Sequence, residues 1–242
     1  MRARTYLPGE SAKNDRVQDN RLLASLPRKS YRGLLPGLAP VTLDFGHVLY
    51  EPGARIRDVY FPGNSVVSLL TVVDGHSALE VGLVGHEGMV GIPLALGVDI
   101  SPVRALVQGG GAAMRMSAGA FRKALDASEP LQRGLLRYTY GLMAQITQTA
   151  ACNRFHVVEA RLARWLLMTR DRVGSRQFRL TQEFLSHMLG VRRVGVTHAA
   201  SALQRRGLIE YERGNIRIMD NAGLLAAACS CYPLVRQRAG GT

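Results

Sequence analysis

Residues 180–203 read LTQEFLSHMLGVRRVGVTHAASAL, and their pattern predicts how the C-terminal part of the chain folds. Thr181 precedes a helical pattern, and its hydroxyl is suited to cap the first turn of a helix. Three apolar residues then fall on one face of that helix: Phe184, Leu185 and Met188. Gly190 can adopt the tight turn that leads into a second helix. The stretch therefore predicts a helix-turn-helix between about Thr181 and Arg206.

The second helix of this pair has an apolar face and a polar face. The apolar face combines Val194 or Val196 with Ala199 and Leu203. The other face carries hydrogen-bonding and small residues: Arg192, Arg193, Thr197, His198, Ser201 and Gln204. A helix with such a face can seat closely in the major groove of DNA, with its N-terminal residues at the base edges. The pattern indicates a recognition helix over about 192–204.

Residues 207–218, GLIEYERGNIRI, follow this helix with alternating apolar and polar side chains. The alternation continues on both sides of Arg213-Gly214-Asn215, which predicts a short β-hairpin. Side chains at the tip of such a hairpin can contact phosphates, so Arg213 and Asn215 join the candidate DNA contacts. Arg205 is a further candidate, with a solvated helix end as the alternative interpretation.

The charge of the chain is concentrated in the same region. The formal net charge is 31 − 18 = +13. Residues 151–242 contain 15 Arg, no Lys and 6 acidic residues, which gives 15 − 6 = +9, whereas residues 1–150 have 16 − 12 = +4. Arginine suits phosphate and guanine because its planar group donates two parallel hydrogen bonds. The balance favours a polyanionic partner, most simply nucleic acid, over a role in solubility alone.

The middle of the chain, from Val41 to about Met116, has a β-rich texture. Six short runs predict strands: Val41–Phe45, Val48–Tyr50, Asp58–Phe61, Ser65–Val73, Ala78–Leu83 and Arg104–Gln108. Glycine or proline separates them, and Asp74-Gly75 between two valine-rich runs is a hairpin signal. Strands at this spacing predict a small antiparallel roll. Residues 1–19 are polar and without periodicity, and we expect a disordered leader there.

Helices are expected on both sides of this roll. Two short ones cover Asn20–Leu26 and Pro27–Leu35, and Ser117 is a plausible cap for another. A long helix runs from about Pro130 to Asn153. Five of its residues alternate steps of four and three and form a predicted dimerisation seam: Leu135, Thr139, Leu142, Ile146 and Thr149. An ordinary core helix within one chain is the alternative.

A further helix is predicted over about Val157–Arg172, before the helix-turn-helix. Four of its residues form an apolar face: Leu162, Trp165, Leu166 and Met168. The predicted fold class is therefore α+β, with an N-terminal antiparallel β-roll, a long helix and a C-terminal winged helix-turn-helix.

This order of elements, with the stretches LTQEFLSHMLGV and RRVGVTHAASALQRRGLI, resembles the Crp/Fnr family of bacterial regulators over about residues 20–235. The resemblance implies a cyclic-nucleotide-binding-like sensor roll, a homodimer and binding to pseudo-palindromic sites in double-stranded DNA, with RNA polymerase as a candidate further partner. It divides the chain into a leader (1–19), a sensor roll (20–128), a dimerisation helix and hinge (129–154) and a DNA-binding domain (155–242).

The resemblance also assigns roles in the recognition helix. In many family members this helix begins Ser-Arg-Glu-Thr-Val-x-Arg, and the matching residues here are 192–198. Arg193 keeps the first arginine and is expected to contact guanine. Val194 replaces the glutamate and is kept among the candidate DNA contacts, although a contact to a cytosine amino group is lost, and His198 replaces the second arginine. Five residues are expected at phosphates or secondary positions: Arg192, Thr197, Arg205, Arg213 and Asn215.

In the family, the cyclic-nucleotide pocket holds a Gly-Glu pair and an Arg-Ser/Thr pair. Here Glu87, Gly88 and Arg104 are the candidate ligand-binding residues, but they do not sit in that pattern. Cyclic nucleotide is therefore disfavoured as the ligand, and no cofactor is predicted. A small-molecule sensor with DNA binding secondary is the alternative function.

The three cysteines are Cys152, Cys229 and Cys231, which is too few for a disulfide framework and suits a reducing cytosol. The N-terminal cysteines that hold an iron–sulfur cluster in some family members are missing. Cys229 and Cys231 are interpreted as small apolar residues on the last helix, and the six histidines are scattered, so no metal site is predicted. With no catalytic motif, signal segment or membrane-length apolar run, we expect a cytoplasmic protein that is not an enzyme and has no membrane partner.

Overall fold

The computed structural model of the chain describes residues 20–73 and 77–239. The predicted leader, 1–19, and the predicted Asp74-Gly75 turn lie outside the described residues. Within them, no helix combines the length and apolarity needed to span a bilayer.

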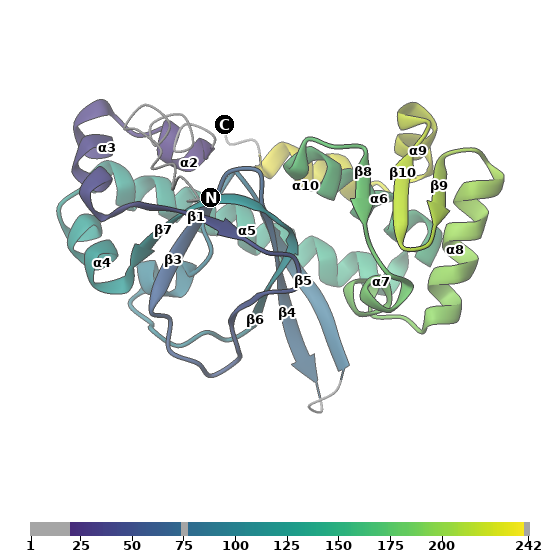
Figure 1. Cartoon of the computed structure of the whole chain (residues 1–242), viewed down its shortest axis with the longest axis horizontal. Helices are drawn as coiled ribbons and strands as arrows, with labels where there is room; N and C mark the ends of the chain where they lie inside the picture. Colours follow the sequence, from purple (N-terminus) through teal and green to yellow (C-terminus); the bar gives the residue numbers. More distant parts are fainter. Residues whose placement is uncertain (1–19, 74–76, 240–242) are drawn as a thin grey trace, which may run out of the picture.

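The N-terminal half is an antiparallel roll, on the left in Figure 1. One sheet has the order β1-β7-β3 and the other β2-β6-β4-β5, and every pairing between neighbours is antiparallel. The seven strands are β1 (Ala39–Leu43), β2 (Val48–Tyr50), β3 (Asp58–Pro62), β4 (Val66–Val73), β5 (Ser77–Val84), β6 (Arg104–Gly109) and β7 (Gly111–Ser117). The predicted α+β class with an N-terminal β-roll is confirmed.

Short helices close the roll. These are α2 (Arg21–Ala24), α3 (Arg28–Leu34), α4 (Ala118–Asp126) and the 3₁₀ turns η1 (Leu35–Gly37) and η2 (Ile92–Leu96). Asn20 caps α2 by accepting a hydrogen bond from the backbone N–H of Leu23 at 3.1 Å. Its side-chain amide also donates to the carbonyls of Pro62 and Gly88, each at 2.9 Å. This buried side chain therefore fastens the start of the described chain to the roll.

The long helix α5 (Glu129–Phe155) presents a face to the roll that differs from the predicted one. Leu135, Leu142 and Thr149 are buried within their own chain, and Thr139 and Ile146 are half-buried. On the same inner side, Gln145 binds both backbone groups of Leu83 on β5. The residues of the predicted dimerisation seam thus lie on the inner face of α5, part of which packs on β5 of the same chain.

A second stripe on α5 lies one residue further along the chain and faces outward. Leu136, Tyr140 and Met143 are 61%, 70% and 62% exposed. One residue is a rotation of about 100° in an α-helix, so this stripe has the same spacing as the predicted seam but a different direction.

The C-terminal part, on the right in Figure 1, combines helices with a small sheet of order β8-β10-β9. Its elements are α6 (Val158–Val173), β8 (Gln177–Arg179), α7 (Gln182–Leu189), α8 (Arg193–Arg205), β9 (Ile209–Glu212), β10 (Asn215–Ile218), α9 (Asn221–Ala227) and α10 (Cys231–Ala239). The predicted apolar face of α6 is confirmed, because Leu162, Trp165, Leu166 and Met168 are all buried.

This part packs directly on the roll. The indole Nε1–H of Trp165 donates to Glu80 Oε1 on β5 at 2.9 Å, and the rings of Phe45 and Phe184 lie 5.6 Å apart. A Cβ added to Gly190 would lie 2.5 Å from Leu79 Cδ1 on β5. The helix-turn-helix is therefore held against β5, the strand that also packs on α5.

Candidate nucleic-acid interface

The helix-turn-helix is formed by α7 and α8. Thr181 caps α7 by accepting a hydrogen bond from the N–H of Phe184 at 3.1 Å. Gly190 ends the helix with φ +60°, a conformation that glycine adopts without strain. The α8 helix begins at Arg193. The predicted cap, turn glycine and second helix are confirmed.

The α8 helix buries Val196, Ala199 and Leu203. Val194 is 64% exposed, so Val196 rather than Val194 is the core residue of the first turn. At the start of the helix, the N-cap residue Arg192 and the first two helical residues, Arg193 and Val194, are exposed.

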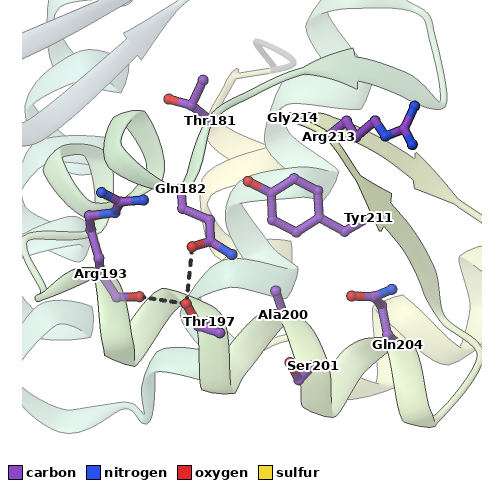
Figure 2. A pocket seen from close by; sticks show the side chains of 10 residues that line it. All are labelled: Thr181, Gln182, Arg193, Thr197, Ala200, Ser201, Gln204, Tyr211, Arg213 and Gly214. Carbon is purple, nitrogen blue, oxygen red and sulfur yellow. Dashed lines mark hydrogen bonds between the residues drawn. The ribbon is translucent and has the colours of Figure 1, made fainter.

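A hollow of about 340 Å³ lies between α8 and the hairpin of β9 and β10 (Figure 2). Its lining is polar and cationic over much of its surface: Thr181, Gln182, Arg193, Thr197, Ala200, Ser201, Gln204, Tyr211, Arg213 and Gly214. From α8 it takes residues three or four positions apart, which form one stripe of the helix. Because the side chains of Ala200 and Ser201 are small, the surface is recessed at the centre of this stripe.

Hydrogen bonds fix several of these side chains. Thr197 Oγ1 lies 3.0 Å from the carbonyl oxygen of Arg193 and 3.1 Å from Oε1 of Gln182, as the dashed lines in Figure 2 show. Tyr211 donates its hydroxyl to the carbonyl of Leu180 at 3.0 Å. Burial raises the pKa of Tyr211, while the nearby Arg193 charge acts in the opposite direction. These hydrogen bonds hold the side of the hollow next to α7 in place, and Arg193 and Arg213 lie at its border.

The hairpin turns through two residues, Arg213 and Gly214, with Glu212 paired to Asn215. Their φ values are +49° and +80°, and Arg213 is the only described non-glycine residue with positive φ. Arginine is a poor choice for this conformation, which asparagine and glycine adopt at lower cost. The turn holds the Arg213 side chain out at the exposed tip.

The ten predicted DNA contacts fall into three groups. Five of them line the hollow: Arg193, Thr197, Ser201, Gln204 and Arg213. Arg192, Val194, His198 and Arg205 are exposed on α8 beside it. Asn215 borders a second hollow at the hairpin, whose lining also includes Gln177, Glu210, Glu212, Arg213 and Arg217. The structure thus places all ten on α8, at its N-terminal end or on the hairpin, and their contacts with DNA stay a prediction.

Sequence reasoning missed part of this lining. It assigns Thr181 and Gln182 only to the start of α7, and Tyr211 only to the hairpin. These three residues could have been predicted from two features of the sequence: a polar pair at the start of the first helix, and an aromatic residue in the hairpin.

Not every arginine of the C-terminal part is available to a partner. Arg161, Arg164 and Arg172 are buried on α6, and Arg170 is paired with Asp171. Arg206 is paired with Glu159 at 2.6 Å. The net charge of +9 therefore overstates the charge that faces outward at the helix-turn-helix.

The three candidate ligand-binding residues of the roll have other partners. Glu87 accepts a hydrogen bond from Arg172 of α6 at 2.8 Å, and Arg104 donates to Glu51 at 2.9 Å. A Cβ on Gly88 would lie 1.9 Å from the ring of Tyr138 on α5, so that ring occupies the space beside Gly88. Ligand binding by Glu87, Gly88 and Arg104 stays a prediction.

Comparison with known proteins agrees with this arrangement. Residues 160–227 match the family profile described as the Crp-like helix-turn-helix domain. No curated protein matches the chain. Many solved structures share its fold. FixK2 from Bradyrhizobium japonicum is 14% identical, with a TM-score of 0.67 over 80% of this chain and 98% of that one.

Two further solved structures are similar over most of their length. The c-di-GMP responsive global regulator CLP of Xanthomonas campestris is 16% identical, with a TM-score of 0.66 over 81% of this chain and 100% of that one. TTHA1359, a transcriptional regulator of the Crp/Fnr family from Thermus thermophilus, is 21% identical, with a TM-score of 0.62 over 78% and 98%. The chain therefore contains a Crp-like helix-turn-helix domain and has the fold of Crp/Fnr-family transcriptional regulators.

Proposed function

We propose that the protein is a homodimeric, sequence-specific transcription regulator that places α8 in the major groove of double-stranded DNA. The observation that carries this proposal is the exposed face of α8 beside the hollow, where Arg193 and Arg213 border a row of small and hydrogen-bonding side chains. Small residues permit close approach to the groove, and the arginine groups can bind guanine or phosphate.

A second copy of the chain is the proposed partner of the outward stripe on α5. Leu136, Tyr140 and Met143 form an apolar row along a helix of about 40 Å, at 1.5 Å per residue. Pairing this row with the same row of another copy would bury it, and a two-fold axis would present two α8 helices to DNA. Half-sites about 34 Å apart, one turn of DNA, would suit such a pair.

The signal that controls the regulator is proposed to act at the roll. The roll and the DNA-binding part share the Trp165–Glu80 hydrogen bond and the Glu87–Arg172 ion pair. A ligand that changed β5 or the segment of Glu87 would therefore act on contacts that hold α6. Glu87 is already bound to Arg172, so the alternative of a ligand sensor with secondary DNA binding has no separate support.

The test is selection of bound fragments from a random DNA pool by the full chain, followed by footprinting and titrations at several salt concentrations. We expect a two-fold sequence and an affinity that falls steeply with salt, with a slope of about 0.9 per phosphate contacted. Enrichment of no sequence, or binding that ignores salt, would overturn the proposal.

A further inference from the structure

A cluster of metal-ligating side chains lies outside the DNA-binding face, at the end of α5. Cys152 and His156 are one helical turn apart there, and the loop after α9 brings Cys229 and Cys231 to the same place. The ligand atoms of these four residues all lie within 4.8 Å of one another. Cys152 Sγ is 3.5 Å from Cys229 Sγ, and Cys231 Sγ is 3.5 Å from His156 Nδ1.

We propose that Cys152, His156, Cys229 and Cys231 bind one zinc ion, which ties the end of α5 to the start of α10. The site goes beyond the proposed function and does not depend on it. The three sulfurs and one imidazole nitrogen match the donor set of tetrahedral structural zinc sites. Hard ions such as Ca²⁺ and Mg²⁺ prefer oxygen ligands, so this set selects against them.

The distances fit a single ion. With Zn–S near 2.3 Å and Zn–N near 2.05 Å, a tetrahedron requires about 3.8 Å between two sulfurs and about 3.6 Å between sulfur and nitrogen. The two separations of 3.5 Å are within a few tenths of an ångström of these values. An iron–sulfur cluster spreads its thiolates around a core of several atoms, so ligand atoms this close together fit one ion instead.

The surroundings favour negative charge at the sulfurs. One Zn²⁺ with three thiolates and a neutral imidazole carries a net charge of −1. The buried side chains of Arg161 and Arg164 lie beside the cluster. The positive charge of Arg164 favours the thiolate form of Cys229, and a thiolate at Cys229 favours the charged form of Arg161. Among the described residues, neither arginine forms an ion pair with a carboxylate, and Nε and Nη1 of Arg164 are buried without a hydrogen-bond partner. A site with a net charge of −1 would offset part of the positive charge of these two buried arginines.

A hydrogen bond at one of the sulfurs also supports the site. Gln148 on α5 donates its side-chain N–H to Cys231 Sγ at 3.0 Å, the kind of hydrogen bond that orients and stabilises a ligating thiolate. Zinc binding would displace the thiol protons to solvent, so affinity should increase with pH.

Sequence spacing concealed this site. Cys229 and Cys231 look isolated as a pair, which favours their interpretation as small residues on the last helix. In the structure Cys229 lies in the loop before α10, and Cys231 is the first residue of that helix. The partners Cys152 and His156 lie 73 or more residues away in sequence and are reached only through the fold.

The experiment measures the metal content of the purified full chain by mass spectrometry, followed by removal of the metal and titration with Co²⁺. We expect about one zinc per chain and the intense visible absorption of Co²⁺ in a tetrahedral thiolate site. His156→Gln and Cys231→Ser should each weaken binding by more than about 100-fold, since even outer partners of a ligand contribute 10–100-fold. His47→Gln, at an exposed histidine of the roll, is the matched control and should change nothing.

Several results would overturn the site. These are a zinc content near zero with no thiolate-to-cobalt absorption, an unchanged affinity in His156→Gln, or a Cys152–Cys229 disulfide found by peptide mapping in the protein as purified. The cobalt spectrum of the unmodified chain keeps the test decisive if a cysteine variant fails to fold. Metal content and absorption do not involve DNA, so failure of DNA binding would leave this result standing.

Discussion

The guanidinium of Arg172 and the carboxylate of Glu87 form an ion pair at 2.8 Å between α6 and the roll, with side chains only 5% and 8% exposed. No other ion pair among the described residues is as deeply buried on both sides. A buried charge that loses its partner is costly, because the interior solvates it poorly. The docking of the helix-turn-helix part on the roll therefore depends in part on this pair, together with the hydrogen bond between Trp165 and Glu80.

Removing one member of this pair should destabilise the protein strongly. We expect Glu87→Gln or Arg172→Gln to lower the free energy of unfolding by about 3–5 kcal/mol, and the double variant to lose much less than the sum. Denaturant unfolding measures this. Glu51→Gln, which breaks the exposed pair with Arg104, should cost less than about 1 kcal/mol. Simple additivity at Glu87 and Arg172 would contradict the prediction.

The stability of the protein should fall as pH rises through the range in which Glu80 ionises. Burial raises the pKa of Glu80 from 4.5 to about 7, against smaller opposing effects of Ser68 and Trp165. The single hydroxyl proton of Ser68 is shared between Glu80 Oε2 at 2.7 Å and Gln108 Oε1 at 2.5 Å. A protonated Glu80 would supply the second donor that this arrangement needs.

Because the folded protein holds this proton more tightly than the unfolded chain, its contribution is complete below about pH 4.5 and is lost as pH rises to about 7. The loss is on the order of 3 kcal/mol at most, at about 1.4 kcal/mol per pKa unit. Denaturant unfolding monitored by circular dichroism from pH 4 to 8 measures it. Glu80→Gln keeps a donor and an acceptor and should remove this part of the pH dependence. Parallel curves for both proteins would contradict the assignment.

Arg193→Ala should reduce sequence preference rather than binding to DNA in general. A bidentate arginine–guanine contact contributes about 1–3 kcal/mol of discrimination between bases. Competition between specific and non-specific duplexes measures it. Arg206→Ala is the matched control, since that guanidinium is paired with Glu159. If affinity for all sequences fell equally, Arg193 would be a phosphate contact.

Arg213→Asn should separate stability from DNA binding. Asparagine tolerates the φ of +49° at this turn better than arginine, so the free energy of unfolding should rise by up to about 1 kcal/mol. The loss of a tip cation should weaken binding to all sequences and lower the salt slope by about 1. Thermal unfolding and salt titrations of DNA binding measure the two effects. An unchanged affinity would show that the tip stays clear of phosphates.

Leu136→Glu should produce monomers, because it places a charge in the outward stripe of α5. Arg137→Glu introduces the same side chain at the next exposed position, about 100° around the helix, and should leave the dimer intact. Analytical ultracentrifugation distinguishes the two. Dimers that survive in Leu136→Glu would rule out this stripe as the interface.

The helix-turn-helix and the roll could be predicted because local signals and packing agree there. Thr181 and Gly190 have the chemistry that a cap and a turn require, and both take those roles. The β7 strand was missed, because GAAMRMS lacks the β-branched residues that mark strands. It is a strand because it pairs with β1 and β3 on both sides.

The direction of α5 could not be predicted from its pattern. Two stripes with the same spacing, beginning at Leu135 and Leu136, are both apolar enough to be buried. Which of them meets the chain's own sheet is decided by β5 and its bond to Gln145, a long-range contact that helical periodicity does not encode. The Cys152 and Cys229 contact was hidden for the same reason.

Trp165 is the only tryptophan of the chain, and its indole lies at the junction between α6 and β5. Its fluorescence emission therefore originates at one place, next to the carboxyl group of Glu80. Any effector that shifts the roll relative to α6 should change the colour or intensity of that emission. The protein thus contains its own optical reporter, with which candidate signals can be screened without attaching a label.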